Sequence, residues 1–381
     1  MKPFPFLALA GLLLAGSMAH GQTLVGRPCL FNEYFPEWRC FPAILRDADG
    51  NLTCGKNRLN LGGITDAPPA AGPVCATSGR FLRGAAPQCH FTYRDAKGGI
   101  QDLWYTRQGE KDQWHSLKLN LGGATDAPLA AGNPAGSFQG DTYHVRYRDM
   151  DGGIQDLAWD GIWHHAQLGA GGEQPAPQAA GDPVPVPFQG RWHVLYRDHA
   201  GALQDLVFDK GWKARALNLG GLTEAPAAGG DPAFLNYLKV PHIVYRDLQG
   251  QLQDLYYDGA WHAQRLTGGG QTTAPPAQGD PAQSVVAGKV RHVLYRDLAG
   301  VLQDLSYDGV WRVQQLNLGG ATKGPQAASD PVALVPPSNW SYVAYVDDQG
   351  LAQLLIQVPG QPWTLMPLDE HTPPGGRKET E

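Results

Sequence analysis

Short apolar runs alternate with polar residues and glycine-rich turns along most of the chain. β-Branched and aromatic residues dominate these runs, which is typical of strands. Between residues 280 and 320 the pattern predicts four strands: 281–286, 292–296, 302–307 and 311–316. Asp297 and Gly300 occupy the first and fourth positions preferred in a type I turn, and Asp308-Gly309 is a two-residue hairpin sequence. This segment is therefore expected to form one four-stranded antiparallel unit.

The same unit recurs along the chain with a period of about 50 residues. The turn aspartate marks each copy, at Asp47, Asp95, Asp149, Asp198, Asp247, Asp297 and Asp347. A period of this length is typical of propellers and repeat arrays. A single four-stranded blade cannot bury both of its faces, so the units must pack on one another and close into a ring. The sequence predicts an all-β fold, a seven-bladed β-propeller over residues 22–368.

Composition agrees with an all-β chain and excludes several other classes. The 49 glycines and 31 prolines are turn formers, and charged residues make up 17% against about 25% in an average domain. Long solvated helices need more charge than this, which argues against a helical bundle. A hydrophobic content of 42% is too high for a disordered chain. The net charge of −6 excludes a broad basic face for nucleic acid.

The two ends of the chain are expected to lie outside the fold. Lys2 precedes an apolar run over residues 4–16, and Ser17 and Ala19 are small residues suited to a cleavage site. Residues 1–19 are therefore predicted to be a signal peptide, because the run is too short to span a membrane. We expect a secreted or periplasmic protein without a membrane span, and a flexible tail over residues 369–381.

Five cysteines fit an oxidising compartment. Cys29 and Cys40 are placed on the first two strands of the first unit, and Cys75 and Cys89 on those of the second. Adjacent antiparallel strands can bring such residues within bridging distance, so we predict the disulfides Cys29–Cys40 and Cys75–Cys89. Cys54 is left over, and the connectivity stays open from sequence alone.

The candidate binding residues are histidines and aspartates spaced 12 residues apart. Five such pairs recur: His90 with Asp102, His144 with Asp156, His193 with Asp205, His242 with Asp254, and His292 with Asp304. Each histidine begins the second strand and each aspartate lies early in the third, so a tight hairpin should bring them together. One interpretation is a hydrogen bond that stabilises the hairpin. The other is a shallow pocket in which carboxylate and imidazole bind the hydroxyl groups of a sugar.

A tryptophan opens the fourth strand of most units. The series comprises Trp114, Trp163, Trp212, Trp261 and Trp311, and Trp363 has the same position in the last unit. These side chains are expected either to form core between blades or to stack on the apolar face of a bound sugar. No cysteine and histidine spacing indicates zinc, and the turns vary too much for a repeated calcium loop. No cofactor, metal site or catalytic residue is therefore predicted.

The recurring string His-Val-x-Tyr-Arg-Asp-x-x-Gly-x-Leu-Gln-Asp-Leu, followed by Trp-x-x-x-x-Leu, resembles the fucose-binding β-propeller lectins of bacteria and fungi. It is most similar to the seven-bladed Photorhabdus-type lectins. The resemblance covers about residues 29–368. It implies that a basic residue of strand two and an acidic residue of strand three hold the sugar, with aromatic residues from the neighbouring blade. Here the acidic residue is Asp, where the family usually has Glu.

These observations favour a carbohydrate-binding, non-enzymatic propeller with several sugar sites between its blades. The resemblance implies glycans or glycoconjugates as partners, fucosylated ones among them. The alternative is a non-catalytic propeller that binds protein partners, and a hydrolase acting on glycans is the least favoured interpretation. Nucleic acid is not expected as a partner.

Overall fold

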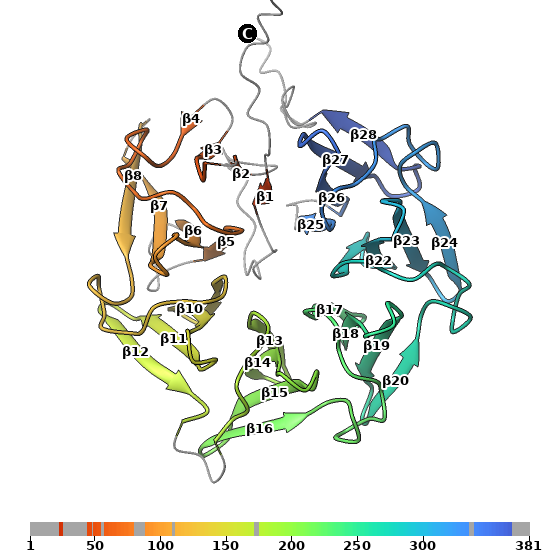
Figure 1. Cartoon of the computed structure of the whole chain (residues 1–381), viewed down its shortest axis with the longest axis horizontal. Coiled ribbons are helices and arrows are strands. Elements are labelled where there is room, and N and C mark those ends of the chain that lie inside the picture. Colours follow the sequence, from red (N-terminus) through yellow and green to blue (C-terminus); the bar gives the residue numbers. More distant parts are fainter. Residues whose placement is uncertain are drawn as a thin grey trace, which may run out of the picture.

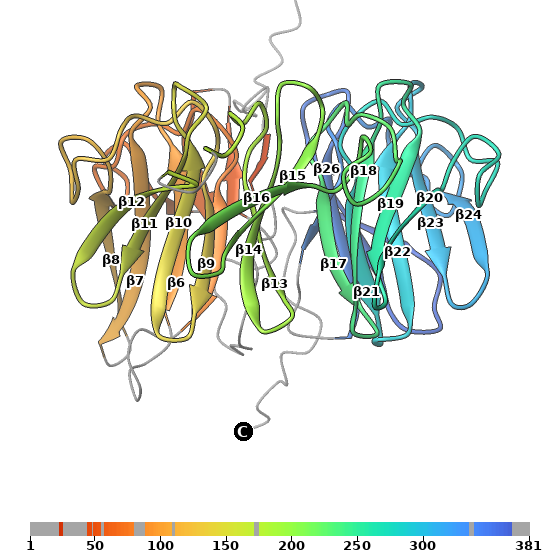
Figure 2. The same cartoon turned by 90° about the horizontal axis from the view of Figure 1, so that it is seen from below.

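The computed structural model describes residues 23–25, 44–47, 49–54, 57–79, 88–108, 111–170, 175–334 and 339–367. Within these ranges the strands form four-stranded antiparallel sheets, in which each strand pairs with the next one along the chain. The sheets stand around a common centre, as blades of a propeller (Figure 1), and their strands run between the two faces of the ring (Figure 2). In each complete blade the first strand lies at the centre and the fourth at the rim. The predicted all-β propeller with four-stranded antiparallel blades is confirmed.

Among the described residues, six blades are complete. The first two comprise β5 (Cys75–Gly79), β6 (Gln88–Arg94), β7 (Ile100–Gln108) and β8 (Lys111–Lys118), then β9 (Ala135–Gln139), β10 (Thr142–Arg148), β11 (Ile154–Trp159) and β12 (Trp163–Leu168). The next two comprise β13 (Val184–Phe188), β14 (Arg191–Arg197), β15 (Leu203–Phe208) and β16 (Trp212–Ala216), then β17 (Ala233–Tyr237), β18 (Val240–Arg246), β19 (Leu252–Tyr257) and β20 (Trp261–Arg265). The last two comprise β21 (Ala282–Val286), β22 (Val290–Arg296), β23 (Leu302–Tyr307) and β24 (Trp311–Gln315), then β25 (Val332–Leu334), β26 (Ser341–Val346), β27 (Ala352–Gln357) and β28 (Thr364–Pro367).

The first repeat is reduced by comparison. Its described residues form a sheet of short strands: β1 (Thr23–Val25), β2 (Ile44–Arg46), β3 (Leu52–Cys54) and β4 (Asn57–Arg58). The prediction of a seven-bladed propeller is therefore corrected to six complete blades and one reduced sheet among the described residues, and no strand of the reduced sheet exceeds three residues. The fourth strand of this repeat also lacks the tryptophan that opens the other fourth strands.

The turn aspartates explain why the repeat string is so regular. In the β18–β19 turn, Asp247 Oδ1 accepts hydrogen bonds from the backbone N–H groups of Gln249 and Gln251, over 2.9 and 2.8 Å. Asp247 Oδ2 accepts a hydrogen bond from Nε2 of Gln253 over 2.8 Å. The other five complete blades repeat this arrangement. The glutamine of each Leu-Gln-Asp therefore has a structural role, and the predicted turns are confirmed.

A series of hydrogen bonds, which we call the clasp series, links successive blades near the Asp-Pro sequences. The N–H of Asn133 donates to Asp182, that of Asp182 to Asp231, that of Asp231 to Asp280 and that of Asp280 to Asp330, over 3.0–3.3 Å. Each carboxylate also lies against the glycine that precedes the donor residue in the neighbouring blade. A Cβ atom on that glycine would collide with the carboxylate. This contact accounts for the Gly-Asp-Pro sequence of the repeat.

The hydrophobic core is built between blades. Leu217 of one blade packs with Tyr245 and Leu255 of the next, and Trp261 covers this cluster. The other tryptophans of the series also pack, partly buried, against clusters of this kind: Trp114, Trp163, Trp212 and Trp311. Their predicted structural role is therefore confirmed. A role in ligand binding remains a prediction.

The predicted disulfide between Cys75 and Cys89 is wrong. The register of β5 with β6 places Thr92 opposite Cys75 and Ser78 opposite Cys89. Cys89 is thus three positions from the residue facing Cys75, which directs the two sulfur atoms to opposite faces of the sheet. Cys89 is a free, buried thiol, and burial raises its pKa to about 11 although Tyr105 donates a hydrogen bond to it. Cys75 is itself disulfide-bonded, so its partner is another cysteine.

Several predictions fall outside the described residues. The proposed bridge between Cys29 and Cys40, the signal peptide over residues 1–19 and the tail over residues 369–381 all lie there. In the part of the chain that the structure describes, no helix is long and apolar enough to cross a bilayer.

Candidate functional site between two blades

All five histidines meet their aspartates, as the hairpin spacing predicts. In the register of β18 and β19, His242 faces Tyr256 and Val244 faces Asp254, so His242 and Asp254 are diagonal neighbours on one face of the blade. The closest distance from Nδ1 to a carboxylate oxygen is 2.7 Å for His90–Asp102, 2.9 Å for His144–Asp156, 2.6 Å for His193–Asp205, 3.1 Å for His242–Asp254 and 2.9 Å for His292–Asp304.

The pairs are buried between blades, and their surroundings differ. In three gaps a ring side chain packs on the histidine. The Tyr143 ring lies 4.5 Å from His90, Phe188 lies 5.2 Å from His193, and Trp363 lies 5.7 Å from His292. Trp363 also donates its indole N–H to Asp304 over 3.1 Å. These contacts are what the hairpin-stabilising interpretation requires.

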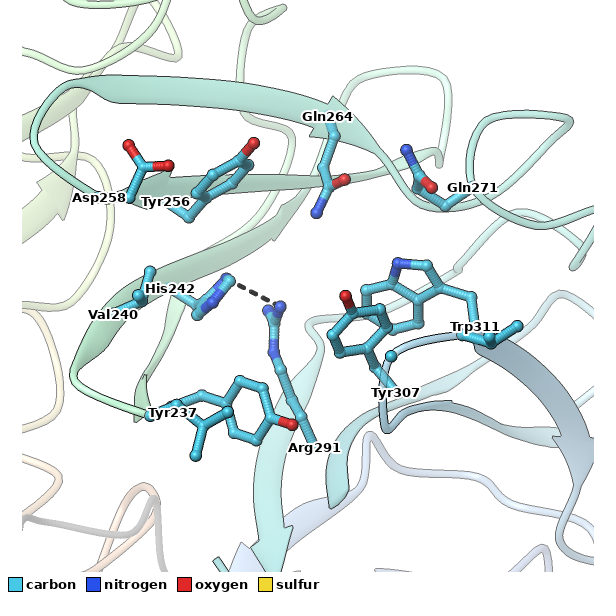
Figure 3. Close-up of a pocket in the computed structure, with 13 residues that line it drawn as sticks. Tyr237, Val240, His242, Tyr256, Asp258, Gln264, Gln271, Arg291, Tyr307 and Trp311 are labelled. Atoms are coloured by element: carbon cyan, nitrogen blue, oxygen red, sulfur yellow. Dashed lines mark hydrogen bonds between the residues drawn. The ribbon is translucent and has the colours of Figure 1, made fainter. Parts of the chain in front are cut away.

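The gap between blade β17–β20 and blade β21–β24 contains a pocket of about 620 Å³. Figure 3 shows aromatic and polar side chains facing one another across it. We call it the Arg291 pocket. One wall carries Tyr237, His242, Tyr256 and Gln264, and the other carries Arg291, Tyr307 and Trp311. Rings, amides and an imidazole around a cavity of this size are suited to a small polar ligand with an apolar face.

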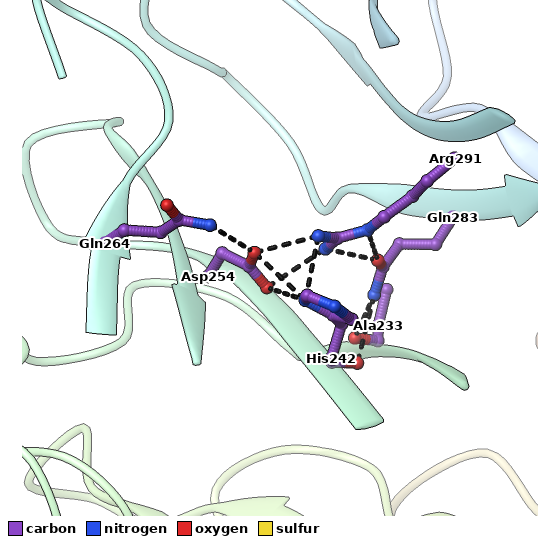
Figure 4. A network of polar contacts seen from close by, with 6 residues as sticks. All are labelled: Ala233, His242, Asp254, Gln264, Gln283 and Arg291. Atoms are coloured by element: carbon purple, nitrogen blue, oxygen red, sulfur yellow. Dashed lines mark hydrogen bonds and ion pairs between the residues drawn. The ribbon is translucent and has the colours of Figure 1, made fainter. Parts of the chain in front are cut away.

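A buried ionic network includes two residues that line the Arg291 pocket, His242 and Arg291 (Figure 4). Arg291 Nη1 and Nη2 donate to the two oxygens of Asp254 over 2.8 and 3.0 Å. Nε and Nη2 donate to Oε1 of Gln283 over 3.1 and 2.8 Å, and Nη1 also donates to Nδ1 of His242 over 2.8 Å. The guanidinium carbon lies 5.6 Å from the ring centre of Trp311. Arg291 therefore joins the two blades at the pocket.

The network changes the acidity of Asp254. Burial alone would raise the pKa of this carboxyl group, but the positive charge of Arg291 and its hydrogen bonds lower the pKa to about 2. Among the described residues, His90 is the one hydrogen-bond partner of the equivalent Asp102 side chain. There burial prevails over the attraction of His90, and the pKa is raised. The same two repeat residues therefore have different electrostatics in different gaps.

Stability should consequently fall in acid because of Asp254. Its pKa is about 2 in the folded protein and about 3.9 in an unfolded chain, so its contribution is complete above roughly pH 4. Between about pH 4 and pH 2 the unfolded chain binds the proton first, and the free energy of unfolding decreases. Urea unfolding from pH 2 to pH 5 should show a shallower acid slope for Asp254→Asn than for the wild type. Identical slopes would contradict this assignment.

Sequence reasoning identified His242, Asp254 and Trp311 but missed Arg291, Tyr237, Tyr256 and Gln264. A signal for Arg291 was present. The residue before the paired histidine is Cys89, Tyr143, Trp192, Pro241 or Arg291, so only one copy carries a cation there. Its partner Asp254 belongs to the preceding repeat, and no spacing within one repeat connects the two.

Among the described residues, no three His, Cys, Asp or Glu side chains gather as a metal site.

No protein-family model matches the sequence, and no curated protein matches it. Solved structures match the fold. A lectin from Burkholderia pseudomallei is 14% identical, with a TM-score of 0.60, over 91% of this chain and 98% of that chain. The Aleuria aurantia lectin, described as a six-bladed propeller with a novel fucose recognition mode, is 14% identical, with a TM-score of 0.46, over 79% and 97%.

Proposed function

We propose that the protein is an exported, carbohydrate-binding propeller that holds neutral sugars between its blades, with the Arg291 pocket as its best-formed site. The observation that carries the proposal is the composition of this pocket. Trp311 and Tyr307 offer aromatic surface to the apolar face of a sugar ring, and His242 and Gln264 offer polar atoms to its hydroxyl groups. The positive charge of Arg291 is already compensated by Asp254, which favours a neutral ligand over an acidic one.

The other four His–Asp pairs count as further sites only if sugar reaches them. Tyr143, Phe188 and Trp363 pack on three of the histidines, whereas the pair of His144 and Asp156 keeps more than a tenth of each side chain exposed. We therefore infer fewer occupied sites than the five pairs of the repeat, with the Arg291 pocket filled first.

We infer in addition that the ring closes with seven blades. The reduced sheet β1–β4 has the strand order of the complete blades, and β1 contacts β26 of the last blade. An experimental structure of the full chain would count the blades directly.

Trp311→Ala should weaken sugar binding about tenfold, since loss of a stacked ring costs roughly 1.4 kcal/mol. The repeat string resembles that of fucose-binding lectins, so methyl α-L-fucopyranoside is the first ligand to titrate by calorimetry, followed by a glycan array. Trp261→Ala is the matched control, because Trp261 has the same place in its blade but faces a gap that contains Phe188. The proposal fails if the folded protein binds no glycan, or if both variants lose affinity equally.

A protein-binding propeller is the second candidate. Its support comes from three turns between second and third strands that expose large apolar side chains. Met150 is 71% exposed, Leu248 67% and Leu298 73%. Exposed apolar groups that recur at one position of a repeat are suited to a protein partner. A negative glycan array on folded protein would favour this candidate.

A further inference from the structure

We propose that Arg291 is a positioning residue that sets the tautomer of His242, so that the Arg291 pocket presents an imidazole N–H to its ligand. This proposal deepens the sugar-binding function and rests on it for the identity of the ligand. In this pair the free ring nitrogen of the histidine is then a hydrogen-bond donor. In a pair such as His193 with Asp205, the free ring nitrogen is an acceptor.

The hydrogen bonds of Arg291 supply the first step. A guanidinium group has five N–H donors and no acceptor. Two of them go to Asp254, two to Gln283 and one to Nδ1 of His242. Arg291 is 1% exposed, and no donor remains for a ligand. Its influence on the pocket must therefore pass through the groups that it contacts.

The second step concerns the proton on His242. Arg291 cannot give up its proton in a protein, so Nδ1 of His242, 2.8 Å from Nη1, must act as the acceptor. A proton on Nδ1 would point one N–H donor, of His242, at another N–H donor, of Arg291. The neutral imidazole then carries its proton on Nε2. The distance from Nδ1 to both oxygens of Asp254 is 3.1 Å, longer than the 2.6 Å between His193 and Asp205.

His193 is the internal contrast. Its Nδ1 lies 2.6 Å from Oδ1 of Asp205, while Arg215 holds the other oxygen of that carboxylate over 2.8 Å. The position that corresponds to Arg291 in the next blade is Pro241, which has neither a side-chain donor nor a backbone N–H. Nδ1 of His193 therefore donates to Asp205, and Nε2 is left without a proton.

The third step places the donor in the pocket. His242 lines the cavity, with its ring stacked 5.6 Å from Tyr256 and tilted 6.2 Å from Tyr237. Within the described residues no hydrogen bond to its Nε2 is formed, and its side chain is 11% exposed. A ligand oxygen that accepts a hydrogen bond, such as a sugar ring oxygen or a hydroxyl oxygen, is the chemical complement of this group.

Nitrogen-15 NMR of the ligand-free full chain, labelled at histidine, tests the tautomer directly. The expected spectrum has His242 protonated at Nε2 and His193 protonated at Nδ1, with His242→Gln and His193→Gln used to assign the signals. A proton on Nδ1 of His242 in the wild type would overturn the proposal. This measurement needs no ligand, so a failure of the sugar-binding function would be seen separately.

Arg291→Lys provides the causal test while keeping the charge beside Asp254. A lysine ammonium cannot reproduce the five-donor pattern, so His242 should move its proton to Nδ1 and donate to Asp254. Binding of methyl α-L-fucopyranoside should weaken about tenfold, and His193 should keep its signals. Arg312→Lys, at an exposed ion pair in the same blade, should change neither. An unchanged His242 tautomer in Arg291→Lys, or a changed tautomer with unchanged affinity, would overturn the assigned role.

Discussion

Replacing Arg291 with methionine is expected to lower the free energy of unfolding by about 3–5 kcal/mol, the usual cost of removing one partner of a buried ion pair. Asp254 is 0% exposed and would lose two charged hydrogen bonds at once. Gln283 would lose the donors to its carbonyl oxygen. Urea unfolding followed by tryptophan fluorescence measures the effect.

Two further variants separate this cost from a general effect of substitution. Arg312→Met removes a cation whose pair with Asp308 is exposed, so its unfolding midpoint should stay close to that of the wild type. The double variant Arg291→Met with Asp254→Leu should recover part of the loss, because it leaves no buried charge unpaired. If Arg291→Met proves as stable as Arg312→Met, the buried network contributes little to holding the two blades together.

Removing the turn carboxylate of Asp247 should cost about 3 kcal/mol, since two backbone N–H groups lose a charged acceptor and each such bond contributes roughly 1.5 kcal/mol. Asp247 is 3% exposed, so water cannot fully replace the lost oxygen atoms. Asp247→Asn should be milder than Asp247→Ala, because the amide oxygen can still accept from Gln249 and Gln251. The two variants can be compared by their urea midpoints.

Asp308→Ala is the control for Asp247, because the Asp308 carboxylate is exposed in a hairpin of the next blade, where it pairs with Arg312. Its midpoint should remain near that of the wild type. Equal losses for Asp247→Ala and Asp247→Asn would show that the backbone bonds to Oδ1 are not the source of the stability.

Much of the fold could be predicted because its determinants lie within one repeat. The expected strands at 292–296 and 302–307 correspond to β22 and β23, and the turn from Asp297 to Gly300 joins them. Alternation, turn residues and a spacing of 12 are local properties of a hairpin. For the same reason the contact between each histidine and its aspartate could be expected from the sequence.

The features that escaped prediction depend on contacts between repeats or on strand register. Arg291 and Asp254 are 37 residues apart on different blades, and no periodic pattern marks the first as a partner of the second. The filling of a gap by Phe188 depends on Tyr257 and Trp261 of the next blade. The Cys75–Cys89 bridge failed because the register of two strands decides which faces their side chains share, and composition does not reveal that register.

The clasp series bears on how such a chain can change over evolutionary time. Its links join residues 49 or 50 positions apart, which is one repeat. A duplicated or deleted repeat brings or removes one carboxylate together with one N–H, so every remaining donor still finds an acceptor in the blade that follows it. A shorter insertion between two aspartates would shift one carboxylate away from its donor. Gain or loss of a complete repeat therefore preserves the pairing of every clasp.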